Sequence, residues 1–172
     1  MKRILILLFG LAAYAVFFLT FLYLVAFVGN LQVTLLADAL PWMPGLVPFS
    51  IDFGRDGGPI AAAVAVDLTL ILLFALQHTV MARTGFKAWL KRIAPPSVER
   101  SVFVLLSSLV LVLLFWQWRP IPGVLWSAES SIGEWVGWSL FGAGFGIVLV
   151  STFLIDHFDL FGLRQIWAAF RA

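Results

Sequence analysis

The sequence predicts an all-α membrane protein, a polytopic helical bundle with four transmembrane helices and additional interfacial amphipathic helices. Of the 172 residues, 62% are apolar and only 12% are charged, whereas a soluble domain carries about 25% charged residues. This number of charged residues cannot cover the surface of a soluble domain of this size. The remaining apolar surface is therefore expected to face lipid. With no cysteine in the chain, disulfides and thiolate metal sites are excluded, and we expect no metal site.

Four apolar segments are long enough to cross a bilayer, whose core requires about 20 mostly apolar residues in a helix. Asp67 is the only charged residue inside them. We expect them to form a single transmembrane domain over residues 1–172. The predicted spans are residues 4–28, 60–80, 102–118 and 135–155.

The first segment has one alternative, a secretory signal peptide. Lys2 and Arg3 form a basic start, and residues 13–15 (Ala-Tyr-Ala) resemble a cleavage site. The apolar region of a signal peptide is only about 7–15 residues long, but here it continues to Val28. An uncleaved span is therefore favoured.

The basic residues predict the orientation, because cytoplasmic loops are enriched in lysine and arginine. With the N-terminus inside, nine of the eleven basic residues fall in inner segments, and only Arg55 and Arg119 fall outside. Both termini are therefore predicted to be cytoplasmic. The nine are Lys2, Arg3, Arg83, Lys87, Lys91, Arg92, Arg100, Arg164 and Arg171.

The segments between and after the spans differ in character. Residues 30–58 are rich in proline and glycine, which predicts an outer loop with turns that caps the helices. Residues 82–100 carry apolar side chains at helical spacing opposite lysines and an arginine, which is typical of a basic helix on the inner leaflet. Residues 156–172 predict a second interfacial helix, with Leu160, Leu163, Trp167 and Phe170 on one stripe.

The two histidines, His78 and His157, are predicted to lie at the same membrane face. Each lies at the inner end of a span that runs from outside to inside, and Asp156 and Asp159 flank the second one. The alternative is that these are ordinary interfacial residues at helix ends. Arg83, Glu99 and Arg100 belong to the same predicted layer.

Asp67 is the most unusual residue, because ionisable groups inside spans are costly and often functional. It precedes His78 by 11 residues, about three helical turns, so both side chains face one side, roughly 16 Å apart. The alternative is a protonated Asp67 that bonds a neighbouring serine or threonine.

Four ordered motifs resemble those of the membrane methanethiol S-methyltransferases. This family is similar to the NnrU-like and isoprenylcysteine carboxyl methyltransferase-like proteins, which implies a bacterial-type inner membrane. The group typically continues into a segment with an Arg-His-Pro-x-Tyr-x-Gly motif and further cofactor-binding helices. This sequence has no His-Pro dipeptide, so we expect a truncated member. The motifs are QHTVMAR (77–83), PPSVERS (95–101), FWQWRP (115–120) and IDHFDLFGLRQ (155–165).

The resemblance implies transfer of a methyl group from S-adenosylmethionine to methanethiol, giving dimethyl sulfide. The partners would be the lipid bilayer and a small volatile thiol, with no nucleic acid. His78 or His157 would remove the thiol proton, with Asp156 or Asp159 orienting its partner. Arg83 and Arg100 would hold the cofactor carboxylate, or else anchor to lipid phosphates. Glu99 is assigned to the cofactor, and Asp67, Gln77 and Asp159 to the substrate pocket.

Two other functions are compatible with the sequence. Two histidines from different helices at one membrane face can ligate one haem iron axially, which would make the chain a haem-binding anchor subunit. The chain can also be a non-catalytic accessory protein of the NnrU-like kind. Binding of S-adenosylmethionine would distinguish an enzyme from an accessory protein.

Overall fold

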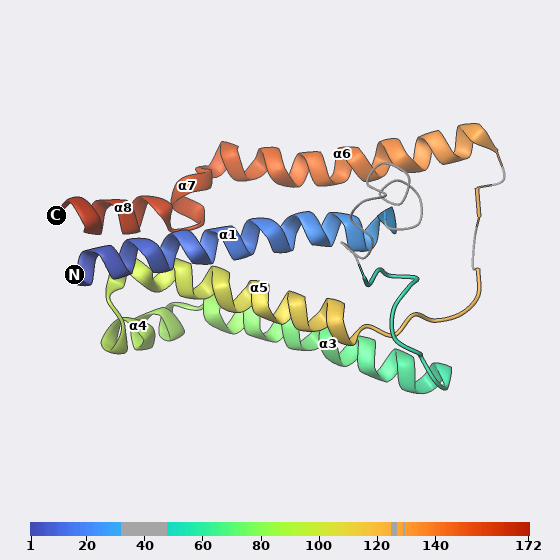
Figure 1. The fold of residues 1–172 in the computed structure, drawn as a ribbon, viewed down its shortest axis with the longest axis horizontal. Helices are drawn as coiled ribbons and strands as arrows, with labels where there is room; N and C mark the ends of the chain where they lie inside the picture. Colours follow the sequence, from blue (N-terminus) through green and yellow to red (C-terminus); the bar gives the residue numbers. More distant parts are fainter. Residues whose placement is uncertain (32–47, 125–126, 129) are drawn as a thin grey trace.

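Four long helices dominate the computed structural model, which describes residues 1–31, 48–124, 127–128 and 130–172. They are α1 (Lys2–Val28), α3 (Ile60–Ala82), α5 (Glu99–Gln117) and α6 (Ser131–Ile155) (Figure 1). By length and hydropathy each can cross a membrane, α5 together with the turn that precedes it. The described residues contain no strand. The predicted all-α fold with four spans is therefore confirmed.

The helices differ from the predicted spans by only a few residues at their ends. The first, third and fourth begin two to four residues earlier than predicted, because a helix continues through polar residues that hydropathy does not count. The start of α6 shows the local cause. The side chain of Ser130 accepts a hydrogen bond from the backbone N–H of Gly133 and so caps the first turn.

The centre of the bundle is α5, which packs against both α1 and α3. At the outer half, Phe27 of α1, Leu70 of α3 and Phe115 of α5 belong to one buried cluster. Residues 48–53 close this end, where Tyr23 donates a hydrogen bond to the carbonyl of Phe49. The predicted cap is thus confirmed for the described part of the outer loop, and residues 32–47 lie outside the described residues.

In contrast, α6 stands apart from the other spans and buries none of its residues. It reaches α1 through two rings: Phe145 lies 6.1 Å from Phe21, and Phe141 lies close to Gly29. Beyond its first turn its glycines face open space, since a Cβ added at Gly137, Gly142, Gly144 or Gly146 would meet no atom within 4 Å.

Three short helices complete the end of the bundle that holds both termini, here called the inner end (Figure 1). They are α4 (Thr84–Ile93), α7 (His157–Leu160) and α8 (Leu163–Arg171). The two predicted interfacial helices correspond to α4 and α8. However, α8 lies alongside the N-terminal part of α1, and the residue it buries is Ile166, which is off the predicted stripe. Ile166 fits against Gly10, where a side chain would collide with it.

Candidate active site at the inner end

A cavity of about 210 Å³ lies at the inner end, and we call it the inner pocket. It is bounded by the end of α3, by α4, by the start of α5 and by α7. One wall is apolar and the rim is charged. The lining residues are Met81, Ala82, Phe86, Lys87, Leu90, Glu99, Arg100, Phe103 and Leu160.

Ion pairs hold the charged rim in place. Lys91 Nζ of α4 lies 2.9 Å from Glu99 Oε2 of α5, which ties α4 to the bundle. Arg100 lies 3.1 Å from the carboxylate of Asp159 and also donates a hydrogen bond of 3.0 Å to the Asp159 carbonyl. Lys87 has no ion pair among the described residues, so its charge is available to a ligand.

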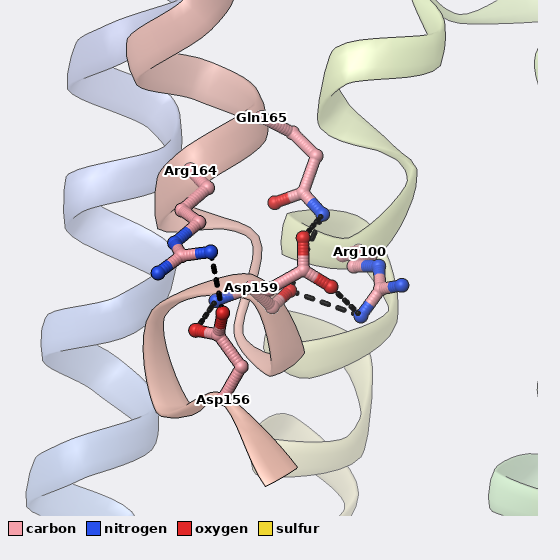
Figure 2. A network of polar contacts seen from close by, with 5 residues as sticks. All are labelled: Arg100, Asp156, Asp159, Arg164 and Gln165. Atoms are coloured by element: carbon pink, nitrogen blue, oxygen red, sulfur yellow. Dashed lines mark hydrogen bonds and ion pairs between the residues drawn. The ribbon is translucent and has the colours of Figure 1, made fainter. Parts of the chain in front are cut away.

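The α7 turn carries a polar network that fixes Asp159 (Figure 2). Asp156 accepts a hydrogen bond of 3.1 Å from the backbone N–H of Asp159 and pairs with Arg164. The side-chain amide of Gln165 donates a 2.9 Å bond to Asp159. Both predicted aspartates therefore organise the turn, and Asp159 holds Arg100. Within the described part of the chain, neither carboxylate bonds an imidazole.

His78 stands beside the inner pocket with an exposed side chain. Its ring packs against Phe74 and against Phe103, whose ring centroid is 4.9 Å away and which lines the pocket. Neither ring nitrogen of His78 makes a hydrogen bond within the described part of the chain. A free imidazole nitrogen at this position can accept a proton.

His157 has a different environment, because it is only 4% exposed. Its Nε2 lies 2.8 Å from the hydroxyl of Tyr14, and its Nδ1 lies 2.8 Å from Thr152 Oγ1. Phe153 stacks on the ring at 4.3 Å, and Phe161 meets it edge-on. This burial lowers the pKa of His157 below its ordinary value, because the charged imidazolium loses its hydration.

The two imidazoles do not form one shared site in the described structure. His78 packs toward α5, whereas His157 packs against Tyr14 of α1. Tyr14 is 12 residues after the start of α1, roughly 18 Å along that helix. His157 therefore lies beside the middle part of α1, and α7 and α8 follow it toward the inner end. With both its nitrogens bonded, His157 has none free to ligate a haem iron.

The remaining predicted residues lie at different depths. Gln77 faces α5, where its amide donates to Ser107 at 3.3 Å, one turn from the inner pocket. Asp67 is buried at the outer end, where it accepts a 3.0 Å bond from the backbone N–H of Arg119. Arg83 is exposed at the junction of α3 and α4 and does not line the pocket.

Sequence reasoning missed three residues that shape the site: Tyr14, Lys87 and Phe103. Tyr14 carried a usable signal, because a phenol in the middle of a span needs a hydrogen-bond partner. The other two gave none, since Lys87 resembles any lysine of a basic helix and Phe103 any apolar residue of a span. Among the described residues, no group of three or more histidines and carboxylates is arranged to hold a metal ion.

Several relatives of this chain carry the same name. It is 46% identical over 171 residues to a methanethiol S-methyltransferase of Mycobacterium tuberculosis, covering 99% of this chain and 64% of that protein. A methanethiol S-methyltransferase of Crocosphaera subtropica is 44% identical over 170 residues, which is 99% of this chain and 61% of the relative. The chain is a homologue of the methanethiol S-methyltransferases. It spans a little over 60% of the length of these two relatives.

A more distant similarity extends beyond bacteria. Nurim of Mus musculus is 35% identical over 117 residues, which cover 63% of this chain and 43% of Nurim. No protein-family model matches the sequence, and no solved structure matches it. The homology to the methanethiol S-methyltransferases therefore rests on sequence identity with individual relatives.

Proposed function

We propose that this chain is a membrane methyltransferase that converts methanethiol to dimethyl sulfide, with the inner pocket as the reaction site. The observation that supports this most is the free imidazole of His78 beside a cavity with an apolar wall and a cationic rim. The homologues named methanethiol S-methyltransferase supply the reaction. A small apolar thiol also partitions readily into the bilayer that surrounds such a site.

His78 is the proposed general base. An alkyl thiol ionises no more readily than cysteine, whose pKa is about 8.5, so little thiolate exists at neutral pH. The S–H proton passes to the free nitrogen of His78, and the thiolate sulfur is then the nucleophile. Base catalysis of this kind typically contributes 10²–10⁴-fold. His157 is less suited to this role, since both of its ring nitrogens are engaged.

S-adenosylmethionine is the proposed methyl donor. When bound, it supplies an electrophilic sulfonium methyl, whose S–C bond breaks as the new S–C bond to methanethiol forms, leaving a neutral thioether. The donor set of the inner pocket fits its zwitterionic amino-acid end: Arg100 and Lys87 suit the carboxylate, and Glu99 suits the ammonium group. The apolar wall around Phe103 favours the reaction, because charge is lost in the transition state.

The proposed environment is a bacterial-type inner membrane, with the inner pocket facing the cytoplasm, where S-adenosylmethionine would be available. The four apolar spans support a membrane location, and the distribution of basic residues supports the orientation. The lipid bilayer and a volatile thiol are the proposed partners.

The proposal is tested by incubating the purified protein in lipid nanodiscs with methanethiol and methyl-labelled S-adenosylmethionine, and measuring labelled dimethyl sulfide in the headspace. We expect labelled product, and a 10²–10⁴-fold lower rate in His78→Gln. His157→Gln is the matched control, because it replaces the other histidine. Absence of labelled product, or equal rates in wild type and His78→Gln, would contradict the proposal. Complete inactivity would favour an NnrU-like accessory protein.

A further inference from the structure

The buried histidine has a hydrogen-bond arrangement that determines the position of its proton. Thr152 donates its single hydroxyl hydrogen to the carbonyl of Leu149, at 2.7 Å. The same oxygen lies 2.8 Å from His157 Nδ1. A threonine hydroxyl has only one hydrogen to donate, so toward His157 it accepts. The imidazole therefore carries a hydrogen on Nδ1.

The protonation state of Nε2 follows from that of Nδ1. His157 is enclosed by the rings of Phe153, Phe158 and Phe161, and no carboxylate of the described residues bonds its ring to stabilise a second proton. A neutral imidazole with a hydrogen on Nδ1 has a bare Nε2, which can only accept. The Tyr14 hydroxyl, 2.8 Å away, is therefore the donor. The chain of bonds runs from Tyr14 through His157 and Thr152 to the backbone of α6.

This chain of bonds joins three helices at a strained point. Asp156, the residue that links α6 to α7, has a φ of 133°, a conformation that strains the backbone of a residue other than glycine. Such a backbone persists only where its surroundings hold it in place. His157, the next residue, anchors the turn to Tyr14 of α1, and Asp156 itself pairs with Arg164.

The turn held in this way forms one wall of the inner pocket. Asp159 binds Arg100 through both its carboxylate and its carbonyl, and Leu160 lines the cavity. Gly162, with a φ of 86°, lets the chain pass close to α5, where an added Cβ would lie 3.1 Å from the Cβ of Arg100 and from the backbone nitrogen of Ser101. A shift of α7 would therefore move Arg100 and the rim of the pocket.

We infer that His157 is a positioning residue: as a neutral imidazole protonated on Nδ1, it links Tyr14 to Thr152 and holds the Asp159–Leu160 turn, and with it Arg100, at the inner pocket. Only the use of that pocket depends on the proposed function. The tautomer and its two bonds are properties of the fold, so they can be tested without enzyme activity.

The direct test is ¹⁵N and ¹³C NMR of histidine-labelled protein in nanodiscs at pH 7, with His157 assigned from the spectrum of His78→Gln. We expect Nδ1 to be protonated and Nε2 to be unprotonated. Tyr14→Phe should shift the Nε2 resonance and leave the proton on Nδ1. Thr152→Val should redistribute the proton between the two nitrogens. A proton on Nε2 in the wild type, or no response to either variant, would overturn the inference.

A kinetic test separates positioning from base catalysis. If His157 only positions the turn, His157→Gln, which can still accept from Tyr14, should retain activity within about tenfold of wild type, well short of the 10²–10⁴-fold loss expected for a base. Tyr14→Phe should raise KM for S-adenosylmethionine more than it lowers kcat, because Arg100 moves. A loss of 10² or more in kcat with unchanged KM would overturn the positioning role. Failure of the proposed function would instead abolish activity and leave the NMR result intact.

Discussion

The contact between Gly10 and Ile166 determines how closely α8 approaches α1, and with it the position of the α7 turn. A Cβ at Gly10 would lie 2.4 Å from Ile166 Cδ1 and 2.6 Å from its Cγ2, well inside van der Waals contact. Ile166 is only 1% exposed, so it has no free space to move into. Overpacking of this kind costs about 1–3 kcal/mol. Gly10→Ala should therefore separate the two helices and destabilise the protein.

The matched control is Gly144→Ala in α6, where an added Cβ meets nothing within 4 Å. Both substitutions gain about 1 kcal/mol of helix propensity, so the difference between the two variants isolates the clash. For a chain of this length, about 2–4 °C of melting temperature corresponds to 1 kcal/mol. Thermal unfolding in detergent, followed by circular dichroism, should thus place Gly10→Ala several degrees below Gly144→Ala.

The same contact predicts that the effects of substitutions at Gly10 and Ile166 on stability are coupled. Ile166→Ala removes the atoms that clash, so Gly10→Ala should be neutral or stabilising in that background, with a coupling of about 1 kcal/mol or more. If Gly10→Ala melts at or above Gly144→Ala in the native background, the close packing of α8 on α1 is wrong. The position of the α7 turn, which is inferred from this packing, would then be unsupported.

Three further predictions concern stability. Asp67→Asn keeps the acceptor for the Arg119 N–H and should change the free energy of unfolding by less than about 1 kcal/mol, whereas Asp67→Leu leaves that donor unpaired and should cost about 1–3 kcal/mol; equal losses would contradict this. Lys91→Gln breaks a half-exposed ion pair with Glu99 and should cost at most about 1 kcal/mol; a larger drop in melting temperature would refute it. Among the described residues, Tyr14 is the titratable side chain that contacts His157. Burial lowers the pKa of His157, so as the pH falls the unfolded chain binds a proton at this residue before the folded chain does. Stability should therefore fall as the pH drops below about 6.5, and a melting curve of His157→Gln with the same pH dependence would contradict this.

The fold was largely predictable because hydropathy reports directly on membrane spans. The four helices extend only a few residues beyond the predicted ends, and α4 matches the predicted basic amphipathic helix. The docking of α8 was not predictable, since it depends on the absence of a side chain at Gly10. A glycine in a span has no periodicity that would indicate its neighbour.

The grouping of the charged residues was predictable from the sequence, and their individual contacts were less so. Glu99 and Arg100 line one pocket, and Asp159 forms an ion pair with Arg100 at its rim. The sequence predicts Glu99 and Arg100 in one layer with the residues that flank His157. The contacts of His157 were not foreseen, because they depend on the turn at Asp156 and on a partner, Tyr14, that is 143 positions away in the sequence. Sequence spacing alone cannot show which of two histidines has a free nitrogen.

The proposed function depends most on the inner pocket being the binding site of the methyl donor. Equilibrium binding of labelled S-adenosylmethionine to the protein in nanodiscs tests this directly, with Arg100→Gln as the site variant. Arg55→Gln is the control, because Arg55 bonds the carbonyl of Trp116 at the opposite end of α5. We predict saturable binding that Arg100→Gln weakens at least about tenfold, the loss of one hydrogen bond to a charged group, and that Arg55→Gln leaves unchanged. No binding to the wild type, or equal binding by both variants, would contradict the account.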